Sequence, residues 1–159
     1  MTDRTIILAS TSPYRKELLQ RLGLPFSAVA PPFEEIPGEG TPREVIESFA
    51  RGKARSLRTE HPEAVIIGSD QGLVAGGELL GKPGTVERAR EQLTRLAGGT
   101  HELVTATCVL DARRDEEALT TDVTRLSFRN LSEGEVARYV DLDRPLDCAG
   151  SFRIESLGI

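Results

Sequence analysis

The first part of the chain places a strand directly before a capped helix, and this order constrains the fold more than any other feature. Residues 5–9 form an apolar, strand-like run. Ser12 is a good helix N-cap, and Leu18 and Leu22 then recur at helical spacing. Gly23 is a typical helix stop. A strand that leads so directly into a helix is typical of α/β proteins.

Strand-like and helical patterns continue to alternate along the rest of the chain. Further strand-like runs occupy residues 26–30, 64–68, 103–110 and 122–128. Helical patterns begin at Thr41, near Thr85 and at Ser132, and the first and last of these begin with capping boxes. The apolar stripe of the helix after Thr85 indicates a purely structural helix. This order predicts an α/β fold.

The size, charge and cysteine content of the chain limit the kinds of protein that it can be. Its 159 residues fit a single globular domain, 1–159. With 20 Lys and Arg against 25 Asp and Glu, the net charge of −5 argues against an indiscriminate nucleic-acid-binding protein. Cys108 and Cys148 lack metal-ligand spacing and are expected to be buried thiols. No apolar run approaches the ~18 residues that cross a membrane. We therefore expect a cytoplasmic protein that binds neither nucleic acid nor membrane.

The start of the first helix has the chemistry of an anion site. Its first backbone N–H groups are unpaired and lie at the positive end of the helix dipole. Ser10 and Ser12 add hydroxyls, and Arg15 and Lys16 add positive charge in the first turn. Phosphate is the anion that best fits this set. A capped surface helix with solvated charges is the alternative interpretation.

An apolar strand leads into the sequence Gly68-Ser69-Asp70-Gln71. In open α/β sheets, ligands bind beyond the carboxyl ends of the strands. If this strand neighbours the first one, we expect Asp70 to lie beside the start of the first helix. The alternative is an aspartate that caps a turn, since Asp after Gly-Ser is ordinary turn chemistry.

Further charged residues occur where phosphate chemistry could use them. Lys53 falls inside the apolar stripe of the second helix, and Lys82 lies in an exposed Gly-Lys-Pro turn. Glu34 and Glu35 lie on a Pro- and Gly-rich loop, and with Asp70 they offer the oxygen ligands that Mg²⁺ or Mn²⁺ prefers. The alternatives are a lysine that reaches out to water and glutamates that are simply solvated.

Together these cations and carboxylates fit phosphoryl chemistry. Cations stabilise developing negative charge on phosphate oxygens, and a carboxylate can take a proton from water. Competing motifs are absent from the sequence: it has neither a Walker A sequence nor Gly-x-Gly-x-x-Gly, and His61 and His101 are too isolated for a zinc site or a triad.

The motifs, taken in order, resemble the Maf family of nucleotide pyrophosphatases across nearly the entire chain. They are the Ser-x-x-Arg turn in residues 9–15, the loop acid at Glu34-Glu35, the helix lysine in residues 50–54 and the second lysine at Gly81-Lys82-Pro83. Gly68-Ser69-Asp70-Gln71 and the segment 148–155 resemble the branch that hydrolyses 7-methyl-GTP.

The resemblance implies an elongated α/β fold like that of Maf and ITPase proteins, with a mixed twisted sheet flanked by helices and a cleft between two lobes. It implies cleavage between the α and β phosphates of a nucleoside triphosphate, which removes modified nucleotides from the pool. Asp70 is the expected proton acceptor, and Arg15, Lys53 and Lys82 are expected to bind phosphates. Glu35 and Asp70 are expected to hold Mg²⁺ or Mn²⁺. The residues expected to bind substrate are Ser10, Ser12, Tyr14, Gln71 and Glu155.

The chain departs from the family pattern at three places. Tyr14 stands where this branch often has tryptophan, and Gly72 replaces a β-branched residue. Family members generally continue past the segment 157–159, so we expect the family's C-terminal strand and helix to be missing from this chain. A homodimer is also expected from the resemblance. A dTTP or UTP pyrophosphatase of the same fold and a non-catalytic, nucleotide-binding regulator of cell division are the alternative functions.

Overall fold

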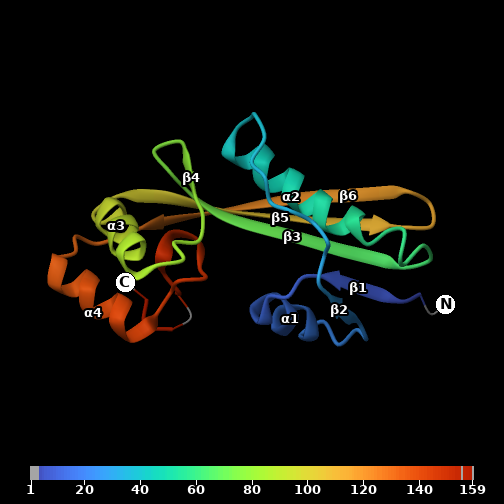
Figure 1. Ribbon diagram of the computed structural model, residues 1–159, viewed down its shortest axis with the longest axis horizontal. Helices are drawn as coiled ribbons and strands as arrows, with labels where there is room; N and C mark the ends of the chain where they lie inside the picture. The colour runs from blue at the N-terminus through green and yellow to red at the C-terminus, as the bar shows by residue number, and fades with distance from the viewer. Residues whose placement is uncertain (1–3, 155, 159) are drawn as a thin grey trace. The chain divides into compact units, whose positions relative to one another are not determined.

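The computed structural model describes residues 4–154 and 156–158. Strands and helices alternate through most of this part of the chain (Figure 1). The elements are β1 (Ile6–Ala9), α1 (Pro13–Gln20), β2 (Ser27–Val29), α2 (Pro42–Ser56), β3 (Val65–Ala75), β4 (Glu78–Leu80), α3 (Val86–Leu96), β5 (Thr100–Asp111), β6 (Glu116–Ser127), α4 (Glu133–Asp143) and the 3₁₀ turn η1 (Ala149–Ser151).

The strands form one mixed sheet. Their order is β2-β1-β3-β5-β6, and β4 pairs with β3. β1 is parallel to both β2 and β3, whereas β4 is antiparallel to β3. The predicted α/β fold with a mixed sheet is therefore confirmed, and the expected cleft between two lobes stays a prediction.

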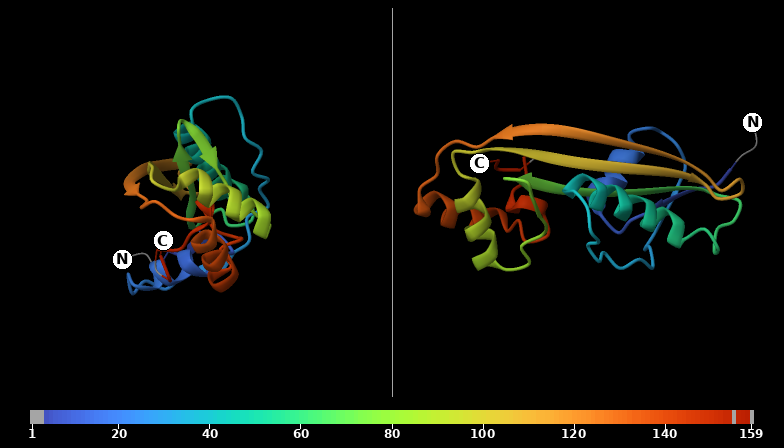
Figure 2. Two further views of the ribbon diagram at one scale, coloured as in Figure 1. Left: turned by 90° about the vertical axis from the view of Figure 1, so that its left-hand side faces the viewer. Right: turned by 90° about the horizontal axis from the view of Figure 1, so that it is seen from above.

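The chain divides into two compact units. Unit 1 comprises Met1–Asp70 and Thr105–Asp122, and unit 2 comprises Gln71–Val104 and Val123–Ile159. The strands β3, β5 and β6 each contribute residues to both units. In unit 2, α3 and α4 lie side by side (Figures 1 and 2).

In unit 1, α2 packs closely against β3 because one position of the strand has no side chain. A Cβ atom on Gly68 would lie 2.2 Å from the carbonyl oxygen of Ala50 and 2.6 Å from the backbone nitrogen of Ala54. The helix begins with the predicted capping box between Thr41 and Glu44. Its buried face includes Ala50 and Ala54, and also Lys53. The small residues thus let the helix that carries Lys53 approach the strand that carries Asp70.

Gly68→Ala is expected to lower the free energy of unfolding by about 3 kcal/mol, because the new methyl group meets helix backbone that cannot rotate away. Urea denaturation measures this change. Gly134→Ala is the matched control, since a Cβ there meets no atom within 4 Å. The control should be neutral or slightly stabilising, because alanine favours the helix. A loss below about 1 kcal/mol for Gly68→Ala would contradict the close packing of α2 on β3.

Unit 2 has its own apolar core, built from the stripes that the sequence predicts. Buried residues of α3 and α4 pack together with Leu73 of β3. Phe128 and Phe152 meet edge to face with ring centroids 5.0 Å apart. The predicted buried side of α4 is confirmed: it consists of Val136, Tyr139 and Val140, together with the polar Asp143.

Some predicted boundaries were wrong. β3 continues to Ala75 rather than ending at residue 68, so Asp70 lies inside a strand and is not a turn aspartate. The glycines that end β3, Gly76 and Gly77, have φ values of 59° and 82° and turn the chain into β4, which the sequence analysis missed. β5 and β6 are also longer than expected. The strands extend past the apolar runs because backbone pairing does not require apolar side chains.

The apolar residues of α1 are exposed, and one of the two cysteines is only partly buried. Leu18 and Leu22 have the helical spacing that was expected, yet they are 59% and 66% exposed, and α1 buries none of its residues. Cys108 is buried as predicted, but Cys148 is only half-buried. Among the described residues, no helix combines the length and apolar character that crossing a membrane requires.

Candidate active site

A buried lysine joins two carboxylates in unit 1. The ammonium nitrogen Nζ of Lys53 lies 2.6 Å from Oδ1 of Asp70 and 2.5 Å from Oε1 of Glu35. The side chains of Lys53 and Asp70 are only 8% and 12% exposed, whereas that of Glu35 is 48% exposed. Lys53 is therefore buried against the buried carboxylate of Asp70 and the half-exposed carboxylate of Glu35, and it does not reach out to water, so the alternative interpretation of this lysine is wrong.

The loop that carries Glu35 is seated on α2 by an aromatic contact. A Cβ atom on Gly52 would lie 2.2 Å from the ring of Phe33, so the ring rests directly on the helix backbone. The same ring meets Phe49 edge to face, with centroids 6.1 Å apart. Gly52 directly precedes Lys53, and Phe33 lies two residues before Glu35. The sequence carries one signal of this support, because a glycine inside a helix can mark a place where another group approaches the backbone closely.

Burial makes the Asp70 carboxyl a better proton acceptor than an exposed aspartate. It raises the pKa of Asp70 above the ordinary value, and the nearby charge of Glu35 acts in the same direction. The hydrogen bond and charge of Lys53 lower the pKa, as does the charge of Arg15, but these effects are outweighed. A raised pKa lets the carboxylate accept a proton more readily at neutral pH.

The sheet register places the start of α1 near Asp70. β1 and β3 are parallel, and Ala9 pairs with Gly68. Ser10 follows Ala9 directly and is 5% exposed. The predicted adjacency of the two strands is therefore confirmed, and Arg15 lies close enough to influence the pKa of Asp70.

The hydroxyls before α1 organise its first turn. Ser10 Oγ accepts a hydrogen bond from the backbone N–H of Ser12 at 3.1 Å. Ser12 Oγ accepts one from the backbone N–H of Arg15 at 3.4 Å, as an N-cap does. Tyr14 lies in the same turn and is 37% exposed. The predicted helix cap is confirmed, and the role of these residues in binding phosphate stays a prediction.

The other candidate residues belong to unit 2 or lie outside the described residues. Gln71 follows Asp70 on β3 and is exposed. Lys82 is exposed in the segment between β4 and α3. Glu155 lies outside the described residues. The structure therefore brings together Lys53, Glu35 and Asp70, with Arg15 nearby. The roles of all the candidate residues stay predictions.

The donor set in unit 1 fits a metal ion that arrives with a phosphate ligand. Glu35 and Asp70 supply two carboxylates beside one ammonium. Within residues 4–154 and 156–158, no group of three or more His, Cys, Asp or Glu could hold a metal ion. Mg²⁺ commonly takes one or two carboxylates, with substrate phosphates and water completing its shell. Glu35 and Asp70 therefore match the number of carboxylates that such a metal–nucleotide complex takes from a protein.

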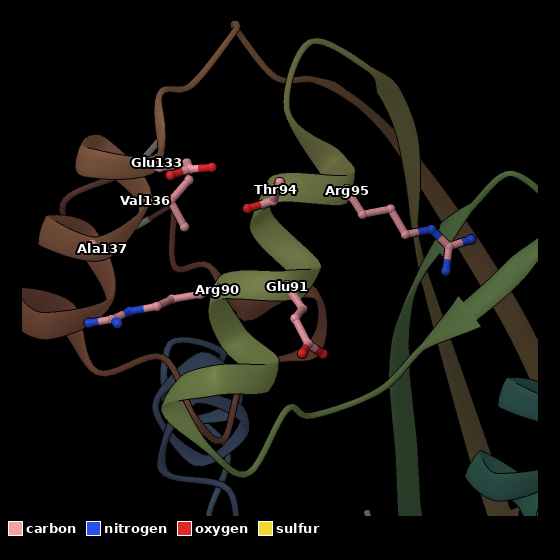
Figure 3. Close-up of a pocket in the computed structure, with 7 residues that line it drawn as sticks. All are labelled: Arg90, Glu91, Thr94, Arg95, Glu133, Val136 and Ala137. Carbon is pink, nitrogen blue, oxygen red and sulfur yellow. The ribbon is translucent and has the colours of Figure 1, made fainter.

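A separate pocket lies in unit 2 between α3 and α4 (Figure 3). Its walls carry charges of both signs, including Arg90, Glu91, Arg95 and Glu133. Arg90 pairs with Asp141 at 2.9 Å. None of the candidate catalytic or substrate-binding residues lines this pocket, so it carries no part of the predicted chemistry.

Comparison with known proteins decides the family. The family described as "Maf-like protein" matches residues 5–159. The chain belongs to the Maf family. The resemblance found in its motifs is therefore confirmed.

Two curated relatives of this Maf protein carry the same name, "7-methyl-GTP pyrophosphatase". The relative from Syntrophotalea carbinolica is 46% identical over 158 residues, which is 98% of this chain and 80% of the relative. The relative from Polaromonas sp. is 47% identical over 160 residues, which is 99% of this chain and 73% of the relative.

Solved structures show the same fold at low identity. A nucleoside-triphosphatase, also named dITP/XTP pyrophosphatase, from Mycobacterium abscessus has a TM-score of 0.50 at 21% identity, covering 77% of this chain and 73% of its own. The Ham1 protein of Staphylococcus aureus has a TM-score of 0.57 at 15% identity, covering 78% and 71%. These likenesses bear on the fold alone.

Proposed function

We propose that this Maf protein is a metal-dependent nucleoside triphosphate pyrophosphatase that hydrolyses 7-methyl-GTP to 7-methyl-GMP and pyrophosphate. Its role would be to remove modified nucleotides from the pool. The observation that carries the proposal is the 46–47% identity, over nearly the whole chain, to relatives named 7-methyl-GTP pyrophosphatase. The buried contact between Lys53 and Asp70 supports the reaction type, because it supplies a cation and a proton acceptor in one place.

In the proposed reaction, Asp70 accepts a proton from the water that attacks the α-phosphate. Its raised pKa supports this role, since a carboxyl buried in this way holds a proton more readily. Lys53 keeps Asp70 oriented and stabilises negative charge on the phosphate oxygens. Arg15, at the start of α1, and Lys82 bind the phosphate chain. The leaving group is pyrophosphate.

Glu35 and Asp70 would hold the divalent metal, Mg²⁺ or Mn²⁺, as ligands of a metal–nucleotide complex. When bound, the metal neutralises phosphate charge and polarises the bond to be cleaved. The contact between Glu35 and Lys53 supports this role for Glu35. Lys53 also contacts Asp70, so the two carboxylates lie on either side of the same ammonium group.

Recognition of the base is proposed for three residues. The ring of 7-methylguanine carries a positive charge, so an aromatic face and a carboxylate both favour it over guanine. Tyr14 can supply the aromatic face, Glu155 the carboxylate, and Gln71 a hydrogen bond to a base edge. The exposure of Tyr14 at the start of α1 supports its part in this proposal.

The test is pyrophosphate release from a panel of 7-methyl-GTP, GTP, dTTP, UTP and CTP, with and without Mg²⁺ or Mn²⁺. We expect metal-dependent release that is selective for 7-methyl-GTP. A preference for dTTP or UTP would contradict 7-methyl-GTP as the substrate. Tight nucleotide binding without release would contradict the enzymatic function and favour a binding protein.

Other expectations stay predictions. They are a cytoplasmic location, assembly as a homodimer and the absence of nucleic-acid binding. Size-exclusion chromatography with light scattering measures the assembly directly, and a monomer at micromolar concentration would contradict it.

A further inference from the structure

One side chain of α3 contacts two loops of unit 2 at once. The Nε2 group of Gln92 donates a hydrogen bond to the carbonyl oxygen of Gly81 at 3.2 Å. Its Oε1 accepts a hydrogen bond from Oγ of Ser151 at 2.5 Å. The two ends of a single amide therefore connect the segment before α3 to the turn η1.

The first loop contains Lys82, which directly follows Gly81. Pro83 is among the residues with less than 2% exposure. The backbone N–H of Gly84 donates to the carbonyl oxygen of Leu146 at 3.0 Å. Lys82 is thus an exposed lysine on a turn whose backbone is fixed on both sides, by Gln92 at Gly81 and by Leu146 at Gly84.

The second loop is held in an unusual backbone conformation. Ser151 has a φ of 61° and is fully buried. Gly150, with a φ of 72°, lies so close to Leu73 that a Cβ would come within 3.0 Å of that side chain. A serine in the left-handed region costs free energy and persists only where its surroundings hold it. The hydrogen bond to Gln92 is one of the contacts that hold Ser151 there.

Two of the described residues that follow Ser151 are hydrogen-bonded to α4. The backbone N–H of Arg153 donates to the hydroxyl of Tyr139 at 2.8 Å. Ser156 Oγ donates to Oδ1 of Asp143 at 2.6 Å, and Asp143 is buried in α4. Ser151 and Arg153 belong to residues 148–155, whose sequence resembles that of the 7-methyl-GTP branch.

We propose that Gln92 is a positioning residue that holds the phosphate-binding turn at Lys82 and the turn at Ser151, which precedes the segment proposed to recognise the base, in a fixed relation to one another. The inference rests on the proposed function for the roles of Lys82 and of the segment 148–155. Gln92 touches neither substrate nor metal in this account. Its contribution is to hold the backbone of both loops through one amide, which links phosphate binding to base selection within unit 2.

Two substitutions separate this role from simple packing. Gln92→Leu replaces the amide with a slightly shorter apolar side chain. It removes both hydrogen bonds and leaves the buried Ser151 hydroxyl without this acceptor. Ser151→Ala removes the hydroxyl instead and leaves Gln92, which is half-buried, within reach of water. Because both substitutions remove the same hydrogen bond, the double variant should have the same KM and the same substrate preference as Gln92→Leu. Gln20→Leu, at an exposed position of α1, makes the same chemical change as a control.

The experiment combines kinetics with hydrogen exchange. We expect Gln92→Leu to raise KM for 7-methyl-GTP roughly tenfold, to change kcat by less than about threefold, and to lower the preference for 7-methyl-GTP over GTP. Exchange of backbone amides should quicken in peptides covering residues 80–84 and 148–154, but not in those covering α2. Gln20→Leu should match the wild type in every measurement.

Unchanged exchange in both loops would overturn the proposal. So would a Gln92→Leu protein that is active with wild-type KM and wild-type preference, even if it melts at a lower temperature. If the wild type releases no pyrophosphate, the proposed function fails, and hydrogen exchange alone then decides whether Gln92 positions the two loops.

Discussion

Asp70→Asn is expected to lower kcat for pyrophosphate release about 10³-fold while changing KM for the nucleotide by less than about threefold. Asparagine fills the same space beside Lys53 but cannot accept a proton from water. The phosphate-binding cations stay in place, so binding of the nucleotide persists. Steady-state kinetics and calorimetric titration of the nucleotide measure the two effects separately.

Glu39→Gln is the matched control for this prediction. It makes the same chemical change at an exposed position of the same loop, four residues away from the glutamate that contacts Lys53. The control should retain kcat within about twofold of the wild type. If Asp70→Asn also kept kcat within tenfold of the wild type, Asp70 would not be the proton acceptor.

Lys53→Met is expected to lower the free energy of unfolding by about 3 kcal/mol at pH 8, because it leaves the buried Asp70 without its cation. Removal of the ammonium also raises the pKa of Asp70 further above its value in the unfolded chain. The native state then binds more protons than the unfolded state, so the variant regains stability as the pH falls. Urea denaturation at pH 5 and pH 8 measures the difference.

Two controls make this result specific to the buried pair. Lys16→Met makes the same change at an exposed position of α1 and should leave stability nearly unchanged. Lys53→Met combined with Asp70→Asn should recover most of the lost stability but no activity, because no buried charge is left unpaired. If Lys53→Met lowered the free energy of unfolding equally at pH 5 and pH 8, an unpaired Asp70 charge would not be the cause of the loss.

The fold could be predicted where local patterns and tertiary structure agree. The caps at Ser12, Thr41 and Ser132 could be recognised because a serine or threonine just before a helix typically accepts a hydrogen bond from its first backbone N–H groups. The continuation of β3 through Asp70 could not be predicted, since polar residues after an apolar run also form turns. The exposure of Leu18 on α1 depends on what packs nearby, which helical spacing does not reveal.

The candidate site was predictable only in part. Lys53 stood out because a lysine in an apolar stripe needs either water or an anion, and the structure gives it Asp70 and Glu35. The contact with Glu35 depends on Phe33 resting on Gly52, a long-range packing event with only a weak sequence signal. The role of Gln92 could not be predicted, because the apolar stripe of α3 is enough to account for a structural helix. Nothing in the sequence singles out one of its polar residues.

The most direct test of the central claim is to identify and count the products formed from 7-methyl-GTP by the wild type. Cleavage between the α and β phosphates predicts 7-methyl-GMP and pyrophosphate in equal amounts, with both nearly abolished in Asp70→Asn. Formation of 7-methyl-GDP and orthophosphate, or no product from 7-methyl-GTP in the presence of Mg²⁺ or Mn²⁺, would contradict it.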